Sequence, residues 1–274
     1  RKSMGVYTLK ESQINDIKQV LKEHNIYVDV NIPKNYSPIQ ALKVFPYQVD
    51  SSIREKLATQ ILGGSDGLTV SIQSPKSAND QPQRIYRRED QIVTFDGGSI
   101  LYRNEGIINA KGSIDSKESE KMAAQWIKNM EYDVKNMHIQ TIQQEDDIYI
   151  IYYDQYKGIP VFDSYVKMHI TPLGISEAKI RKVKIGELTG PKQNIYPADQ
   201  VFFNLIKTIS QNHPIHIKDI MIGYALENPR GTHLIAEDAI PFYQVILESG
   251  EIYYINAYTN ELRDETPPIM DDLQ

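Results

Sequence analysis

The first part of the chain changes between helix-like and strand-like hydrophobic patterns. Apolar residues in segment 12–23 recur every three or four positions, which predicts an amphipathic helix. Alternating apolar residues in 26–32 predict a strand directly after it. A second helix is expected to begin at the capping-box pair Ser52 and Glu55 and to stop at Gly63-Gly64. Two further strands are expected over 68–73 and, with a turn at Gly97-Gly98, over 91–102.

The rest of the chain repeats one order of elements. Each copy begins with an amphipathic helix, at 115–130 and 197–210, and the apolar residues of the two helices have the same spacing. Downstream of each helix an Ile-Pro pair, Ile159-Pro160 or Ile240-Pro241, is expected to open a strand. This order, twice over, indicates an internal duplication. The glycine-containing turns fall at 172–174 and 249–250, and the return strands at 175–185 and 251–257.

These patterns predict an α+β fold, with an N-terminal α/β segment followed by two units that are each a helix packed on an antiparallel sheet. Strand 148–153 is apolar on both faces, so we expect it to be central and covered on both sides. Segment Gly186–Tyr196 contains Gly190-Pro191 and is expected to link the two units. The expected parts are 1–112 (N-terminal segment), 113–188 (first unit), 189–265 (second unit), 266–274 (disordered tail) and, within the first, a mobile polar loop at 74–83.

Composition narrows the classes of function. The chain has 274 residues, of which 41% are hydrophobic and 24% charged, a balance typical of a folded globular protein. The net charge of −6 argues against nucleic acid as a partner. Cysteine is absent, which excludes disulfides, thiolate zinc sites and a cysteine nucleophile. No apolar run reaches the ~18 residues of a membrane-spanning helix. The chain opens Arg1-Lys2-Ser3-Met4, so we expect a fragment or a processed product.

The sequence offers no catalytic, metal-binding or cofactor-binding constellation. No histidine has zinc-helix spacing, and Pro214 keeps the nearest pair, His213 and His216, off a helix, so a polar loop is the preferred interpretation. The glycine-rich stretch 63–67 follows an expected helix instead of a strand, so it is not expected to form a phosphate-binding loop. Acidic runs fall in expected turns or in the tail and are interpreted as solvated surface. The histidines are His24, His138, His169, His213, His216 and His233; the acidic runs are 145–147, 237–238 and 271–272.

Basic and aromatic residues suggest surfaces instead. Lysines and arginines alternate with apolar residues over 179–185, which predicts one charged face of a sheet. That face is interpreted as solvated, with contact to an anionic envelope surface or an acidic partner as the alternative. The 18 tyrosines fit strands with one partly wet face, or a binding surface. The basic residues are Arg84, Arg87, Arg88, Lys179, Arg181, Lys182 and Lys184.

Three segments resemble the YycI proteins of Gram-positive bacteria. Segment 21–27 (Leu-Lys-Glu-His-Asn-Ile-Tyr) resembles their helix-to-strand opening. Segment 156–162 (Tyr-Lys-Gly-Ile-Pro-Val-Phe) is similar to their central hairpin, and 255–262 (Ile-Asn-Ala-Tyr-Thr-Asn-Glu-Leu) to their closing strand and turn. Both hairpins also resemble the PepSY pattern, whose turn is of the Ala-x-Thr-Gly-Glu kind. Asn260 stands where glycine is usual, and asparagine tolerates the left-handed conformation.

The resemblance implies a non-enzymatic regulator with two PepSY-like units and no cofactor. YycI proteins are anchored by one N-terminal membrane helix, absent from this chain, and their soluble portion lies outside the cytoplasmic membrane. With their relative YycH they regulate the sensor histidine kinase WalK (also called YycG), whose two-component system controls cell-wall metabolism. The implied partners are therefore WalK/YycG and a YycH-like protein. No catalytic residue carries over, and the tyrosine-rich strands and exposed sheet faces are candidate contacts without individual residues assigned.

Two other functions stay open at this point. A PepSY-type module can act as an inhibitory or pro-segment module that holds an envelope protease silent. An enzyme could assemble its site from scattered polar residues, and a buried, strongly shifted acid or histidine in a deep pocket would favour that interpretation.

Overall fold

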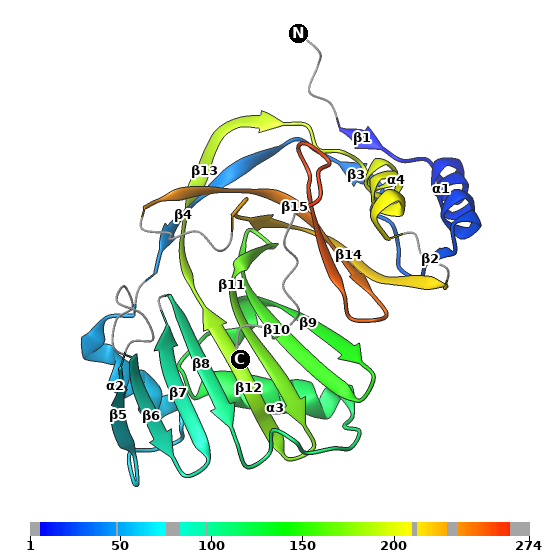
Figure 1. The fold of residues 1–274 in the computed structure, drawn as a ribbon. Helices are drawn as coiled ribbons and strands as arrows, with labels where there is room; N and C mark the ends of the chain where they lie inside the picture. Colours follow the sequence, from blue (N-terminus) through cyan, green and yellow to red (C-terminus); the bar gives the residue numbers. More distant parts are fainter. Residues whose placement is uncertain are drawn as a thin grey trace. The chain divides into compact units, whose positions relative to one another are not determined.

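The computed structural model describes residues 6–47, 49–74, 83–96, 98–209, 213–228 and 235–263. Over these residues the chain is a mixed α+β protein with four α-helices and mostly antiparallel strands. Its contacts form two compact units (Figure 1). Among the described residues, unit 1 combines 6–45 with 185–263, and unit 2 spans 46–184. The expected tail and most of the expected loop at 74–83 lie outside the described residues, and the expected boundaries after 112 and 188 stay a prediction.

Unit 1 contains two helices, a sheet that mixes parallel and antiparallel pairs, and a separate two-stranded ladder. β2 pairs in parallel with β14, which pairs antiparallel with β15, and β15 continues to β16. The first residues of β15 pair with β4, which in turn pairs with β13, and β1 and β3 form a separate ladder. The helices are α1 (Glu11–Glu23) and α4 (Ala198–Ile209). The strands are β1 (Tyr7–Thr8), β2 (Ile26–Val28), β3 (Asn35–Tyr36), β4 (Ile39–Pro46), β13 (Val183–Gln193), β14 (Ile215–Ala225), β15 (Glu237–Leu247) and β16 (Ile252–Asn256).

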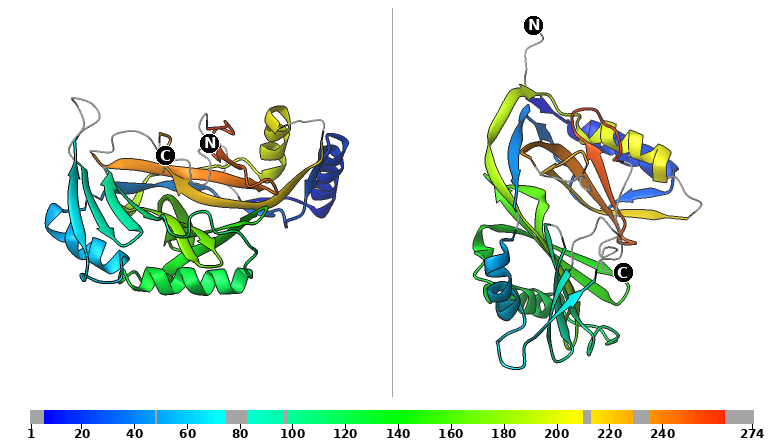
Figure 2. Two further views of the ribbon diagram at one scale, coloured as in Figure 1. Left: turned by 60° about the horizontal axis from the view of Figure 1, so that its bottom comes forward. Right: turned by 60° about the vertical axis from the view of Figure 1, so that its left-hand side comes forward.

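The core of unit 1 lies between its two helices and its sheet. Helices α1 and α4 lie side by side in both views of Figure 2. The apolar stripes predicted for them are buried, with Leu21 on α1 and Phe202 on α4 packed against Ile217 and Tyr243 of the sheet. Burying each such side chain stabilises the fold by about 2 kcal/mol. The Tyr243 hydroxyl donates a 2.5 Å hydrogen bond to the carbonyl of Tyr196, so this buried hydroxyl has a hydrogen-bond partner.

Unit 2 is an antiparallel sheet backed by two helices. The strands run in the order β9, β10, β11, β12, β8, β7, β6, β5, so two sets of four consecutive strands, each preceded by a helix, meet at β12 and β8. The helices are α2 (Ser51–Ile61), α3 (Ser116–Lys128) and a 3-10 turn (Val134–Asn136). The strands are β5 (Thr69–Gln73), β6 (Gln83–Arg88), β7 (Gln91–Asp96), β8 (Ser99–Asn104), β9 (Met137–Gln144), β10 (Asp147–Tyr156), β11 (Ile159–Thr171) and β12 (Gly174–Arg181).

Helix α3 forms where the sequence predicted it. Asp115 caps its N-terminus by accepting hydrogen bonds from the backbone N–H of Lys117 (2.9 Å) and Glu118 (3.3 Å). Ala123, Ile127 and Met130 of its predicted stripe are buried, whereas Met122 and Trp126 are partly buried. The helix packs against β10, β11 and β12. Strand 148–153 is confirmed as an internal strand, since β10 pairs with β9 on one side and β11 on the other.

Three local predictions are wrong. Helix α2 is capped by Asp50, whose carboxylate accepts from the N–H of Ser52 at 2.9 Å, so the Ser52–Glu55 capping box is not formed at the predicted position. Pro160 is the second residue of β11 as expected, but Pro241 lies well inside β15, because that strand begins earlier, at Glu237, to pair with β4.

The third error is the linker expected at Gly186–Tyr196. Most of it is strand β13, which pairs with β4. A Cβ on Gly186 would lie 2.8 Å from the Phe45 ring and 3.0 Å from the carbonyl oxygen of Lys43. Glycine at this position therefore allows β13 and β4 to approach closely. From the sequence alone, such a glycine cannot be distinguished from one in a flexible linker. The structure confirms α+β architecture but does not confirm the arrangement as two PepSY-like units.

Candidate functional site

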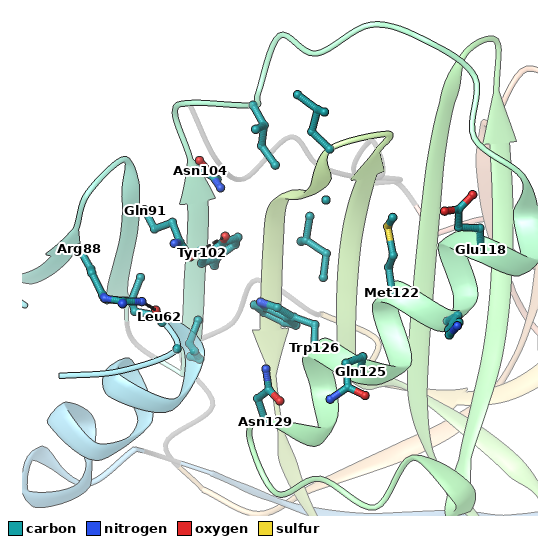
Figure 3. A pocket seen from close by; sticks show the side chains of 17 residues that line it. Leu62, Arg88, Gln91, Tyr102, Asn104, Glu118, Met122, Gln125, Trp126 and Asn129 are labelled. Atoms are coloured by element: carbon teal, nitrogen blue, oxygen red, sulfur yellow. Dashed lines mark hydrogen bonds between the residues drawn. The ribbon is translucent and has the colours of Figure 1, made fainter. Parts of the chain in front are cut away.

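A groove lies on the helix side of unit 2. It has a volume of about 730 Å³ and lies between the C-terminal end of α2 and the exposed side of α3. Strand β8 supplies its floor through Tyr102 (Figure 3). Ile175 of β12 also lines the groove. The groove thus lies where the two helix-and-four-strand sets of this unit meet.

Two aromatic rings form the centre of the groove. Trp126, the single tryptophan of the chain, lies 5.3 Å from Tyr102 between ring centroids, with the rings tilted by 58°. The Tyr102 hydroxyl donates to Oε1 of Gln91 at 3.0 Å. Burial raises the pKa of Tyr102 to about 12, so the phenol stays a neutral donor at physiological pH. The groove therefore has a rigid aromatic centre with a fixed polar neighbour.

Arg88 holds the wall of the groove that faces α2. Its Nη1 donates to the carbonyl of Leu62 at 2.7 Å, and its Nε donates to the carbonyl of Asp66 at 3.0 Å. These carbonyls follow the end of α2, where a cation is favoured by the helix dipole. Gly63 has φ +75°, which allows the chain to turn there as the sequence predicted. Arg88 is thus a positioning residue that joins β6 to α2.

The opposite wall is the polar side of α3. Glu118, Gln125 and Asn129 follow at helical spacing and are exposed, and Met122 and Trp126 lie between them and the core. The apolar periodicity of this helix predicted its buried stripe and gave no indication of the second, polar stripe. The sequence does contain a signal for it, because the carboxamides Gln125 and Asn129 flank Trp126, the single tryptophan of the chain. A helix face that only contacts solvent needs no such combination.

The basic residues expected on one sheet face do not share one environment. Lys179 and Arg181 lie on β12, and Lys184 is exposed at the start of β13. Lys182 lies between those strands with a side chain only 11% exposed, so its expected place on a solvated charged face is wrong. Its Nζ donates to both carboxylate oxygens of Asp154, at 3.0 and 2.9 Å.

Three of the described histidines, His24, His169 and His216, have side-chain hydrogen-bond partners within the chain. His216 Nδ1 lies 2.9 Å from Asp29, which also accepts from Lys218 at 2.9 Å. Within the described ranges no group of three or more possible ligands is placed to hold a metal ion, so His213 and His216 gain no further ligands there. His233 and the acidic pair 271–272 lie outside the described residues.

One constellation that sequence analysis missed joins three adjacent strands. His169 Nε2 lies 2.8 Å from Oδ1 of Asp147, and His169 Nδ1 lies 2.7 Å from Oγ of Ser176. Ser176 is fully buried, whereas the Asp147 side chain is 55% exposed. Hydrolases need the reverse, an accessible serine and a buried acid. The arrangement therefore ties β10, β11 and β12 together and does not present a nucleophile to a substrate.

Comparisons with known proteins give a family match and several similar structures. The YycI protein family matches over residues 6–258. An uncharacterised protein of Eubacterium rectale has a similar structure, with a TM-score of 0.56, 15% identity, and coverage of 86% of this chain and 89% of that one. At this identity the likeness concerns the fold alone. A comparison with curated proteins gives no match.

Two further solved structures were found. YycH from Bacillus subtilis has a TM-score of 0.47 and 12% identity, covering 82% of this chain and 56% of that one. The C-terminal domain of YpeB from Bacillus megaterium has a TM-score of 0.42 and 14% identity, covering 79% of this chain and 96% of that one. Among the helices in the described residues, none is both long and apolar enough to cross a membrane.

Proposed function

The chain belongs to the YycI family, and we propose that it is a non-enzymatic regulator of the sensor histidine kinase WalK/YycG that acts together with a YycH-like protein. The observation that carries the proposal is the family match, which covers residues 6–258. Membership supports a regulatory role in the WalK/YycG system. The finer statements, an N-terminal membrane anchor, an extracytoplasmic soluble portion and control of cell-wall metabolism, are part of the proposal.

The mechanism we propose is a shift of a conformational equilibrium. A regulator that binds one conformation of a kinase more tightly than another changes the populations by the ratio of the two affinities, and no covalent chemistry is required. The geometry supports this, because the Ser176–His169–Asp147 constellation keeps its hydroxyl buried. The two helix-backed sheets supply extended surface in place of a reaction centre.

The finer architecture belongs to the same proposal. Helix α3 with β9–β12 is one helix-backed antiparallel set, and α4 with β14–β16 is a shorter one. We propose that they are the two PepSY-like units, with the turn at Asn260 retained from the second. Asn260 has φ +59°, the left-handed conformation for which glycine is usual at that turn.

The proposal is tested by association in a membrane. The full-length protein is expressed with its YycH-like partner and the kinase, extracted in mild detergent, and captured through a tag on the kinase. We expect this protein to be retained with the kinase, and to be retained more fully when the YycH-like protein is present. An unrelated single-pass membrane protein serves as the control for nonspecific capture. Retention at the level of that control, with and without the YycH-like protein, would contradict the proposed role.

A further inference from the structure

We propose that the groove between α2 and α3 is a binding site for an uncharged oligosaccharide. The inference concerns a ligand of unit 2 and goes beyond the regulatory function proposed above. It depends on the size of the groove, on its aromatic centre and on the kind of polar group in its walls.

The size and the aromatic centre suit a chain of sugar rings. A volume of about 730 Å³ is within the range of about 300–1,000 Å³ found for ligand pockets. Trp126 is only partly buried and lies against Tyr102 on the floor. The face of an aromatic ring is electron-rich, so it attracts the polarised C–H bonds on the flat side of a pyranose. Gln125 and Asn129 lie beside Trp126 on the exposed wall of the groove (Figure 3).

The polar groups match hydroxyls better than they match ions. Gln91, Asn104, Gln125 and Asn129 all line the groove, and each carboxamide both donates and accepts hydrogen bonds, as a sugar hydroxyl does. The Tyr102 hydroxyl donates a hydrogen bond to Oε1 of Gln91. This bond orients the Gln91 amide so that its NH₂ group can donate to a ligand.

The charged side chains in the groove either have hydrogen-bond partners within the chain or lie near a side chain of opposite charge. The guanidinium of Arg88 donates to the carbonyls of Leu62 and Asp66. Glu118 and Lys121 lie about one turn apart on α3 and carry opposite charges. An anionic ligand would therefore find no uncompensated cluster of cations, and an uncharged ligand is favoured.

A peptide is the less favoured occupant. The usual recognition of an extended peptide adds a strand to an open sheet edge. The floor strands offer no such edge, because β12 pairs with β11 and β8, and β8 pairs with β12 and β7. An amphipathic helix would need a row of apolar anchors on both walls, whereas the α3 wall is mostly polar.

Trp126 makes the test direct, because it is the single tryptophan of the chain and lies in the groove. The soluble protein is titrated with cellotetraose, chitotetraose and, as the peptide probe, tetra-alanine, with tryptophan emission and calorimetry as readouts. We expect saturable binding of at least one tetrasaccharide and none of tetra-alanine. The double variant Gln125→Ala/Asn129→Ala should weaken that binding at least tenfold, because two hydrogen-bonding groups are removed. The matched control is Gln19→Ala, an exposed helical glutamine of α1 in unit 1.

Circular dichroism establishes that each variant is folded before it is titrated. Absence of saturable tetrasaccharide binding by both readouts would overturn the proposal. Binding that the double variant leaves unchanged would also overturn it, because the site would then lie elsewhere. Saturable binding of tetra-alanine that the double variant weakens would identify a peptide site and refute the saccharide class.

Discussion

Lys182 provides the sharpest test of how unit 2 is held together. Its ammonium contacts both oxygens of Asp154, at 3.0 and 2.9 Å, and lies over the Tyr132 ring at 4.7 Å from the centroid. Ser164 donates a 2.5 Å hydrogen bond to the same carboxylate. Burial lowers the pKa of Lys182, and the neighbouring Asp154 works against that shift. The pair therefore joins the end of β12 to β10 and β11 at a mostly buried position.

Lys182→Ala removes the cation and leaves Asp154 charged. Breaking a buried pair from one side costs about 3–5 kcal/mol in unfolding free energy. The Asp154 side chain is 28% exposed and keeps some hydration, so we expect the lower end, about 3 kcal/mol. The double variant Lys182→Met/Asp154→Leu removes both charges and keeps apolar volume. It should lose much less than the sum of its two single variants.

Urea unfolding at neutral pH measures these differences, and Trp126 emission reports on unit 2 because the chain has no other tryptophan. Lys128→Ala, at an exposed position in the last turn of α3, is the control and should change stability by less than about 0.5 kcal/mol. The reasoning would be refuted if Lys182→Ala behaved like this control, or if the double variant lost the full sum of the single changes.

Three further predictions concern caps, turns and pH. Asp115→Ala should destabilise unit 2 by about 1 kcal/mol, since it removes the N-cap of α3; a thermal melt that matches the wild type would contradict this. Asn260→Ala should lower the free energy of unfolding by about 1–2 kcal/mol, as followed by circular dichroism. The variant loses the 3.1 Å hydrogen bond from the side-chain amide to the carbonyl of Gln200, and alanine is poorly suited to the backbone conformation at φ +59°. Asn260→Gly should cost less than Asn260→Ala, and the opposite order would show that the backbone conformation is unimportant. Burial raises the pKa of Tyr36, Tyr102 and Tyr132 to about 12 from an ordinary value of 10. The folded state then keeps protons that the unfolded chain loses, so stability is intact below about pH 10 and falls as pH rises towards 12. Urea midpoints that stay constant from about pH 9 to about pH 11.5 would contradict this linkage.

Much of the local structure could be predicted because it depends on neighbours in the sequence. The stripes of α1, α3 and α4 are periodic, and a periodic stripe must be buried against something. The central position of β10 followed from apolar residues on both of its faces. The turns at Gly63 and Asn260 followed from residue types that adopt positive φ, and both have it.

The errors come from contacts between residues that are distant in the sequence. Gly186 looked like a linker residue because its reason, the nearness of Phe45 across a strand pair, has no local signal. Lys182 looked solvated because its partner Asp154 lies on another strand. The groove was missed for the same reason, since Arg88, Tyr102 and Trp126 come from three separate elements.

We propose that this protein changes the activity of the kinase by binding to it. The most direct measurement is the autophosphorylation rate of the full-length WalK/YycG kinase in lipid vesicles, with and without this protein and its YycH-like partner. We predict a rate that changes when both are present, and that returns to the kinase-only value when this protein is omitted. A rate that is the same in every combination, with all three proteins shown to be inserted in the vesicles, would contradict the account.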